Sequence, residues 1–198
     1  MGLFKKRSPE DKFWDWFVEN EERIFGVRDG QEPVFKELVT AIREVNPEMT
    51  FEFGPVEGGK RSFILSADGL KEVVPAVEKL FSTAPELSNW AFVKYRQRRP
   101  LIDVQLGDIN LRPSDVLVTI EEDGPKAGLS VYIKGYRGKM EQQKIGAAFL
   151  MLDNALGEYD MINRVGFIEF YPAEAPSDLV KHNIETLPTV FDNFFKRN

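Results

Sequence analysis

The order of predicted elements repeats along this chain, and that repetition limits the folds open to it. Residues 49–99 predict two strands joined by a glycine-containing turn, then a helix, then a further strand. Residues 115–172 predict the same order. One such β-β-α-β unit buries little apolar surface, so two copies are expected to share a sheet or to pack together. Few residues are identical between the copies, so both a duplication and a chance match of patterns remain open.

Helices are predicted on both sides of the repeated part. Ser8 can cap a helix with Pro9 at its first position, and the apolar spacing continues towards Gly26. A second helix is predicted over residues 31–45, so residues 8–48 form an expected helical hairpin. The last helix is predicted to begin near Thr186.

These elements predict an α+β fold: a mainly antiparallel sheet of about six or seven strands built from two β-β-α-β units, with an N-terminal helical hairpin and a C-terminal helix. Residues 1–7 are expected to be a flexible tail, and residues 8–198 a single domain. Within that domain the expected parts are residues 8–48, 49–114, 115–175 and 176–198.

Composition excludes several kinds of chemistry. The 198 residues include no cysteine, which removes disulfides, thiolate zinc sites and cysteine nucleophiles, and which suits the cytoplasm. The net charge of −6 argues against non-specific nucleic-acid binding, which needs an excess of Lys and Arg. No apolar run reaches the ~20 residues that span a bilayer. We therefore expect neither nucleic acid nor membrane as a partner.

Catalytic and metal motifs are sparse. His182 is the single histidine, and no Gly-x-Ser-x-Gly elbow accompanies it. Residues 54–61 place Gly54, Gly59 and Lys60 as in a phosphate loop, but Arg61 stands where that motif needs Ser or Thr, so a hairpin turn is predicted. A metal would have to bind carboxylates. The densest candidates are Glu158 with Asp160, Asp103 with Asp108, and residues 121–123. No cofactor and no metal is expected.

Two short segments are candidates for binding. Arg96, Arg98 and Arg99 close the predicted strand that begins at Trp90, where Arg96 and Arg98 would face one side about 7 Å apart and could clamp a carboxylate or phosphate. The alternative is that they pair with the protein's own acids, such as Asp103 or Glu169.

The second segment is Glu158, Tyr159 and Asp160, which follow the expected helix stop at Gly157. A loop held by a rigid scaffold often carries function. A polar helix end with no further role is the open alternative.

Aromatic residues are abundant, with sixteen Phe and three Trp. Trp14 and Val18 lie on a different face of the first helix from Phe13 and Phe17, so this helix either is buried on both faces or offers a docking surface. Because interfaces use aromatic anchors, Trp14 is a candidate binding residue.

Several blocks resemble one family of uncharacterised bacterial proteins. They are residues 13–21, 50–54, 66–69, 156–160 and 165–170, and the resemblance spans about residues 11–172. The family has no established activity, so it supplies no catalytic residues. It implies a bacterial, cytoplasmic protein.

The leading hypothesis is a non-enzymatic module that binds another protein, with the immunity partner of a bacterial toxin as a narrower form by analogy. The alternative is a small-molecule or carboxylate-metal-dependent enzyme that binds an anionic substrate through Arg96 and Arg98 and uses Glu158, Asp160 or Glu169 for acid–base work. A homodimer built by edge-strand pairing or by the aromatic first helix is a third possibility.

Overall fold

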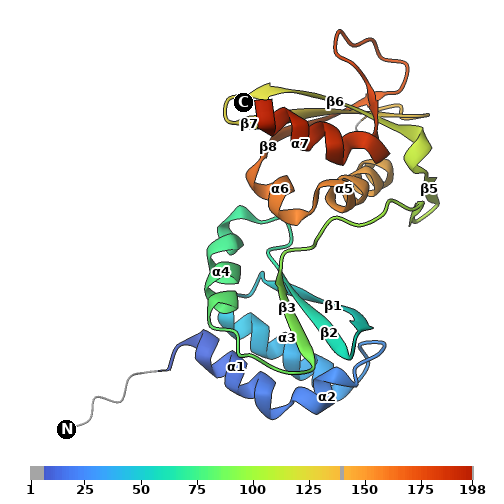
Figure 1. Cartoon of the computed structure of the whole chain (residues 1–198). Coiled ribbons are helices and arrows are strands. Elements are labelled where there is room, and N and C mark those ends of the chain that lie inside the picture. Colours follow the sequence, from blue (N-terminus) through green and yellow to red (C-terminus); the bar gives the residue numbers. More distant parts are fainter. Residues whose placement is uncertain (1–6, 139–140, 198) are drawn as a thin grey trace. The chain divides into compact units, whose positions relative to one another are not determined.

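The computed structural model describes residues 7–138 and 141–197. The chain divides into two compact units, Met1–Tyr95 (unit 1) and Arg96–Asn198 (unit 2), each with its own helices and sheet (Figure 1). The α+β class is therefore confirmed. Of the expected tail, residues 1–6 lie outside the described residues. The single domain over residues 8–198 stays a prediction, and the division between units at Tyr95 lies inside the expected part 49–114.

Unit 1 begins with three helices: α1 (Pro9–Glu19), α2 (Glu21–Phe25) and α3 (Pro33–Val45). Ser8 caps α1 in a capping box, accepting from the Asp11 N–H while the Asp11 carboxylate accepts from the Ser8 N–H. The expected first helix is interrupted at Asn20, whose side chain donates to the Trp16 carbonyl. Asn can bond to the backbone in place of the helical pattern, which explains this break.

The sheet of unit 1 has the order β1-β2-β3, formed by β1 (Thr50–Glu57), β2 (Lys60–Ser66) and β3 (Trp90–Lys94). Strands β1 and β2 are antiparallel, with the predicted hairpin turn at Gly58 and Gly59, whose φ angles are 56° and 81°. Helix α4 (Val74–Ser82), preceded by a short 3₁₀ turn (Lys71–Val73), leads to β3, which runs parallel to β2.

Aromatic rings form the core of unit 1. The ring of Phe63 on β2 is fully buried and lies 5.1–6.4 Å, centroid to centroid, from six other rings. These six are Phe13, Phe17, Phe51, Phe53, Trp90 and Phe92. Because Phe13 and Phe17 come from α1, the aromatic face of this helix packs on the sheet.

Unit 2 contains two sheets. The small one pairs β4 (Val104–Leu106) with β5 (Ile109–Leu111), and the larger one has the order β8-β7-β6-β9. Its strands are β6 (Val116–Asp123), β7 (Lys126–Ile133), β8 (Val165–Pro172) and β9 (His182–Asn183). The helices are α5 (Gln142–Leu156), α6 (Glu158–Asn163) and α7 (Leu187–Arg197), and 3₁₀ turns occupy Pro113–Asp115 and Ile184–Thr186.

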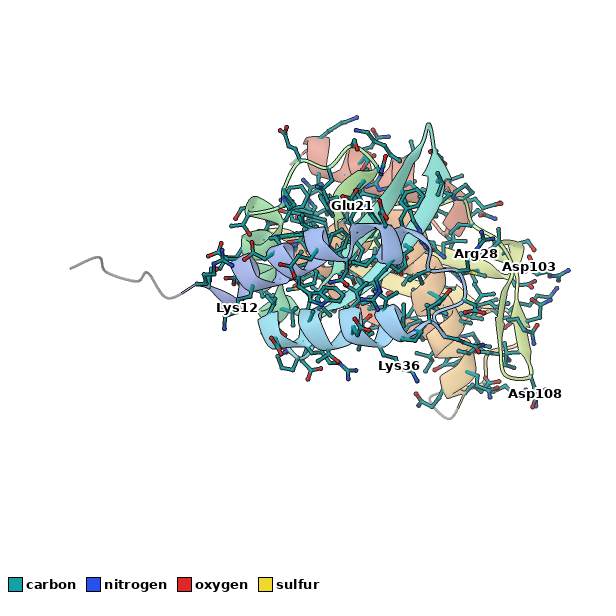
Figure 2. All side chains as sticks on the ribbon, turned by 90° about the horizontal axis from the view of Figure 1, so that it is seen from below. Lys12, Glu21, Arg28, Lys36, Asp103 and Asp108 are labelled. Carbon is teal, nitrogen blue, oxygen red and sulfur yellow. The ribbon has the colours of Figure 1, made fainter. Side chains whose placement is uncertain are left out.

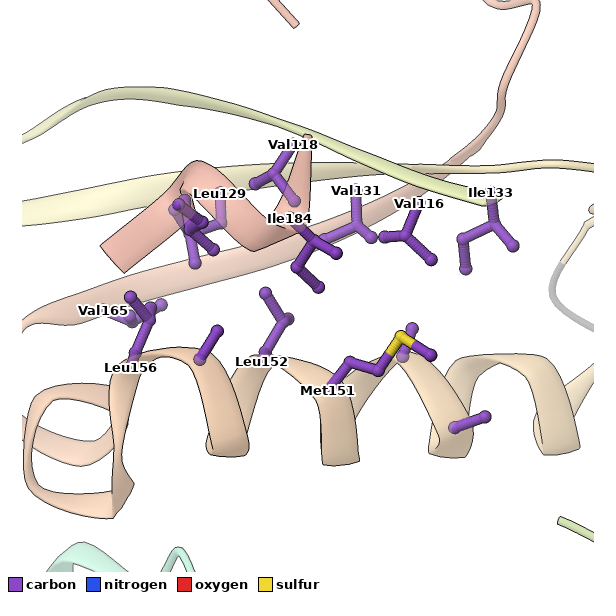
Figure 3. Close-up of a cluster of buried hydrophobic side chains, with 14 of the residues drawn as sticks. Val116, Val118, Leu129, Val131, Ile133, Met151, Leu152, Leu156, Val165 and Ile184 are labelled. Carbon is purple, nitrogen blue, oxygen red and sulfur yellow. The ribbon is translucent and has the colours of Figure 1, made fainter. Parts of the chain in front are cut away.

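The core of unit 2 lies between the larger sheet and α5 (Figure 3). Met151, Leu152 and Leu156 on α5 face aliphatic side chains of the sheet. Helix α7 adds Leu187 and Phe191 to this core. The sheet residues are Val116, Val118, Leu129, Val131 and Ile133. These alternate positions point to one face of the strands, so α5 and α7 cover the same side of the sheet.

The two predicted β-β-α-β segments show the same strand pairing. In each, an antiparallel hairpin is followed by helix and then by a strand that runs parallel to the second hairpin strand: β1-β2-α4-β3 and β6-β7-α5-α6-β8. The described strands form three sheets where one sheet of six or seven strands was expected. None of the described helices is long and apolar enough to cross a membrane.

Candidate functional site

The arginine segment 96–99 does not continue the strand that was expected to contain it. Strand β3 ends at Lys94, and Tyr95 has a φ of 63°, a left-handed conformation that stops the extended backbone. Arg96 and Arg98 therefore do not sit side by side on a strand. Within unit 2 the segment runs along the junction of α5 and α6, where the Arg99 N–H donates to the Asn154 carbonyl at 2.8 Å.

Gly157 makes this close approach possible. It ends α5, as predicted, with a φ of 78° and a ψ of 152°, a conformation that favours glycine. A Cβ atom at this position would lie 3.3 Å from both the Arg96 carbonyl oxygen and the Arg98 nitrogen. The next residue, Glu158, donates its N–H to the Arg96 carbonyl at 2.9 Å.

Arg96 is held by two carboxylates. Its Nε lies 3.0 Å from Asp153 Oδ2, and its backbone N–H donates to Glu158 Oε2 at 2.9 Å. The Glu158 side chain is fully buried. Because a buried carboxylate needs hydrogen-bond and charge partners, Arg96 stabilises Glu158 in this position.

Arg98 binds a carboxylate in the two-pronged geometry that a guanidinium favours. Nη1 and Nη2 donate to the two oxygens of Asp192 on α7 at 2.9 and 2.7 Å. Nη2 also donates to Asp160 at 2.8 Å, and Nε donates to the Leu156 carbonyl at 3.0 Å. The carboxylates of Asp192 and Asp160 raise the pKa of Arg98, and hydrogen bonding to Arg98 lowers the pKa of Asp192. Arg98 thus ties α7 to the α5–α6 junction.

The structure brings four of the seven sequence-predicted binding residues into one cluster: Arg96, Arg98, Glu158 and Asp160. The two arginines pair with the protein's own carboxylates, which come from α5, α6 and α7. The sequence patterns do not identify two further members of this cluster, Asp153 and Asp192. Nothing local in the sequence marks Asp192, which is 94 residues from Arg98.

Tyr159 and Trp14 differ in exposure. Tyr159 projects to the surface and is 49% exposed. Trp14, in unit 1, is 4% exposed, and its Nε1–H donates to the Leu80 carbonyl at 2.8 Å. Its ring packs against Phe13 and Phe92. Of the two possibilities for the first helix, burial applies to Trp14, while Val18 is 45% exposed.

The carboxylates considered as metal ligands are not assembled into a site. Asp103 and Asp108 are exposed and lie on either side of β4 (Figure 2). Within residues 7–138 and 141–197, no three or more His, Asp or Glu side chains gather as they would to hold a metal ion. His182 lies in β9, paired with Val118 of β6.

A groove that the sequence did not reveal lies beside β8. It has a volume of about 500 Å³. Its lining residues come from the segment after β7, from α5 and from β8: Tyr136, Gln142, Ile145, Ile168, Glu169, Phe170 and Tyr171. Phe149 on α5 lies next to it, with its ring 5.2 Å from that of Phe170. Phe149 shares the apolar helical spacing of the buried Ala148 and Leu152, but it is itself 42% exposed.

Comparison of the chain with protein-family models, with curated proteins and with solved structures finds no match. The resemblance to a bacterial family stays a prediction.

Proposed function

We propose that this chain is a protein-interaction module with no catalytic activity of its own. The observation that carries the proposal is the groove beside β8, next to which α5 exposes Phe149, with its ring 5.2 Å from that of Phe170. Neighbouring exposed apolar side chains beside a groove are typical of binding sites, and aromatic residues supply much of the energy of interfaces. The module is proposed to be bacterial and cytoplasmic, in line with the resemblance and the lack of cysteine.

The enzymatic alternative has weaker support from the geometry. An anionic substrate would have to displace Asp192 and Asp160 from Arg98, or Asp153 from Arg96, before either guanidinium could bind it. Glu169, the third acid of that hypothesis, accepts a hydrogen bond from Tyr171 in the groove. Acid–base work needs these groups to converge on one substrate, and the ion pairs instead join helices of the fold.

Affinity capture from the host tests the proposal. The tagged chain is recovered under native conditions, and bound proteins are identified by mass spectrometry. We expect one dominant stoichiometric partner that is lost in Phe149→Lys. The identity of that partner also tests the narrower hypothesis of a toxin's immunity protein.

Leu179→Lys is the matched control, because Leu179 and Phe149 have the same exposed fraction, 42%. This control is expected to keep the partner, and the melting temperature of each variant checks that it is folded. A capture in which the wild-type chain recovers no stoichiometric partner contradicts the proposal.

A further inference from the structure

Strand β8 forms an open edge of the larger sheet in unit 2. It is the first strand in the order β8-β7-β6-β9 and pairs with β7 alone. Just beyond it, Ala173 donates its N–H to Ile133 at the end of β7. Backbone groups alternate in direction along a strand, so odd-numbered residues face β7 while Ile168 and Phe170 direct their N–H and C=O groups to the open edge. Among the described residues, none bonds to these edge-facing groups of Ile168 and Phe170.

Among the described strands, the sheet of unit 1 has two edges, β1 and the five-residue β3, and of these the longer one, β1, carries features that discourage further pairing. Strand β1 contains Pro55, which has no N–H, and its ladder is irregular between Phe53 and Val56. Strand β9 has only two residues. By contrast, β8 has eight residues, with Pro172 only at its end and Glu169 as the one charged residue within it.

The surroundings of β8 define which side chains an added strand would present. Ile168 and Phe170 point to the side of the sheet that α5 covers, and with Ile145 they line the groove. An added strand would place every second side chain in this groove, against the apolar part of its lining formed by Ile145, Ile168 and Phe170. The intervening side chains would lie on the opposite face, beside Glu169.

That opposite face carries the carboxylates of Glu169 and Glu121 and the ammonium of Lys181, whose Nζ lies 3.9 Å from the centroid of the Tyr132 ring. Glu169 pairs across the ladder with Ser130, which pairs with Thr119 of β6, so Glu121 lies on the same face two residues further on. Both carboxylates act on Tyr171, whose pKa is raised first by its hydrogen bond to Glu169 and further by the charge of Glu121. A basic side chain placed directly beside the exposed Glu169 would be attracted by that carboxylate.

We propose that the edge of β8 and the adjoining groove bind an extended segment of a partner protein as an additional strand, with apolar residues alternating with Lys or Arg. This inference rests on the proposed function and names the kind of partner. Backbone hydrogen bonds from Ile168 and Phe170 hold the segment, the groove takes its apolar side chains, and Glu169 selects its basic ones.

A displayed library of random peptides as long as β8 tests the inference, with the purified full-length chain as bait. We expect enrichment of sequences in which apolar and basic residues alternate. Glu169→Lys should shift the enriched charge from basic to acidic, whereas Glu174→Lys, the same exchange outside β8, should leave the preference unchanged. Enrichment of sequences with helical spacing, or a preference that Glu169→Lys leaves unaltered, would overturn the inference.

Amide hydrogen exchange then locates the bound peptide. With a selected peptide at about 100 times its dissociation constant, exchange at Ile168 and Phe170 should slow about a hundredfold, because only the unbound fraction exchanges. The amides of Phe167 and Glu169, which already face β7, should change little. A selected peptide that leaves the amide exchange of Ile168 and Phe170 unchanged would refute strand addition.

The two proposals fail in different ways. A stoichiometric partner that is lost in Phe149→Lys, together with no selected peptide, refutes strand addition and leaves the interaction module standing. A dimer that forms with concentration and protects the same amides without peptide identifies a second copy of the chain as the occupant, and it also refutes this inference.

Discussion

Replacing Arg61 by Met removes a charged group that holds the end of α2. In unit 1, Nη1 of Arg61 donates to the carbonyls of Ile24, Phe25 and Val27 at 3.4, 2.9 and 2.7 Å. The guanidinium also lies 4.1 Å from the centroid of the Phe53 ring. Carbonyls at the end of a helix have no partner within it, so Arg61 supplies the donor they lack.

The expected loss follows from these contacts. The Ile24 carbonyl keeps the N–H of Val27, so two carbonyls lose their donor. An unpaired carbonyl costs about 1–3 kcal/mol when fully buried, so the low end applies to each of these two part-buried carbonyls, and the cation–π contact adds ~0.5–1 kcal/mol. Burial lowers the pKa of Arg61, so its removal regains part of a desolvation cost. The net destabilisation of Arg61→Met is therefore about 2–3 kcal/mol.

Tryptophan fluorescence during urea unfolding measures this loss in unit 1 alone. All three Trp residues, at positions 14, 16 and 90, belong to unit 1. At a denaturant slope of about 1 kcal/mol/M, which suits a unit of this size, the midpoint should fall by about 2 M.

Arg28→Met is the control, because Arg28 is exposed and removal of its side chain is expected to change stability by less than about 0.5 kcal/mol. Arg61→Lys should fall between the two, since one ammonium cannot reproduce the planar guanidinium. Equal midpoints for Arg61→Met and Arg28→Met would refute the reasoning.

Three further predictions concern packing and charge. Gly128→Ala should cost about 1–3 kcal/mol, because its Cβ would lie 2.2 Å from the Phe167 ring; a thermal melt by circular dichroism measures it, and an unchanged melt would contradict the packing. Asp192→Asn should cost about 1 kcal/mol at pH 7. The pKa of Asp192 is lowered by Arg98, so this stabilisation is present above about pH 4 and is lost as the pH falls through the folded-state pKa; a gap in melting temperature from wild type that persists at pH 2 would contradict it. Trp14→Phe keeps an aromatic ring but leaves a buried carbonyl without its donor, and a loss in urea of about 1–2 kcal/mol is expected; no loss would show that the indole N–H is dispensable.

Local sequence signals predicted where a helix begins or ends when a residue at that position itself favours the helix terminus. Ser8 and Pro9 mark the start of α1, and Gly157 ends α5, as observed. Proline favours the first turn of a helix, and Pro75 lies in the first turn of α4, which begins at Val74. These signals act within a few residues, so they can be read from a single sequence.

Such local signals could not predict features that depend on contacts between residues far apart in the sequence. The apolar spacing of α5 places Phe149 with buried residues, but only the position of β8 leaves that ring at the surface. Alternation suggested that the strand from Trp90 continues to Arg98, although it ends at Lys94. Beyond it the segment follows the α5–α6 junction, where Arg98 meets Asp192 from the far end of the chain.

The open edge of β8 gives Glu169 a second consequence, for the solubility of the protein. Residues 167–171 read Phe-Ile-Glu-Phe-Tyr, and without the carboxylate they would form an uninterrupted apolar, strand-forming run with unpaired backbone groups. Such runs are the sequence signature of aggregation, and single charged residues act as gatekeepers against it. Glu169 thus protects the protein from self-assembly at the same edge that its partner is proposed to use.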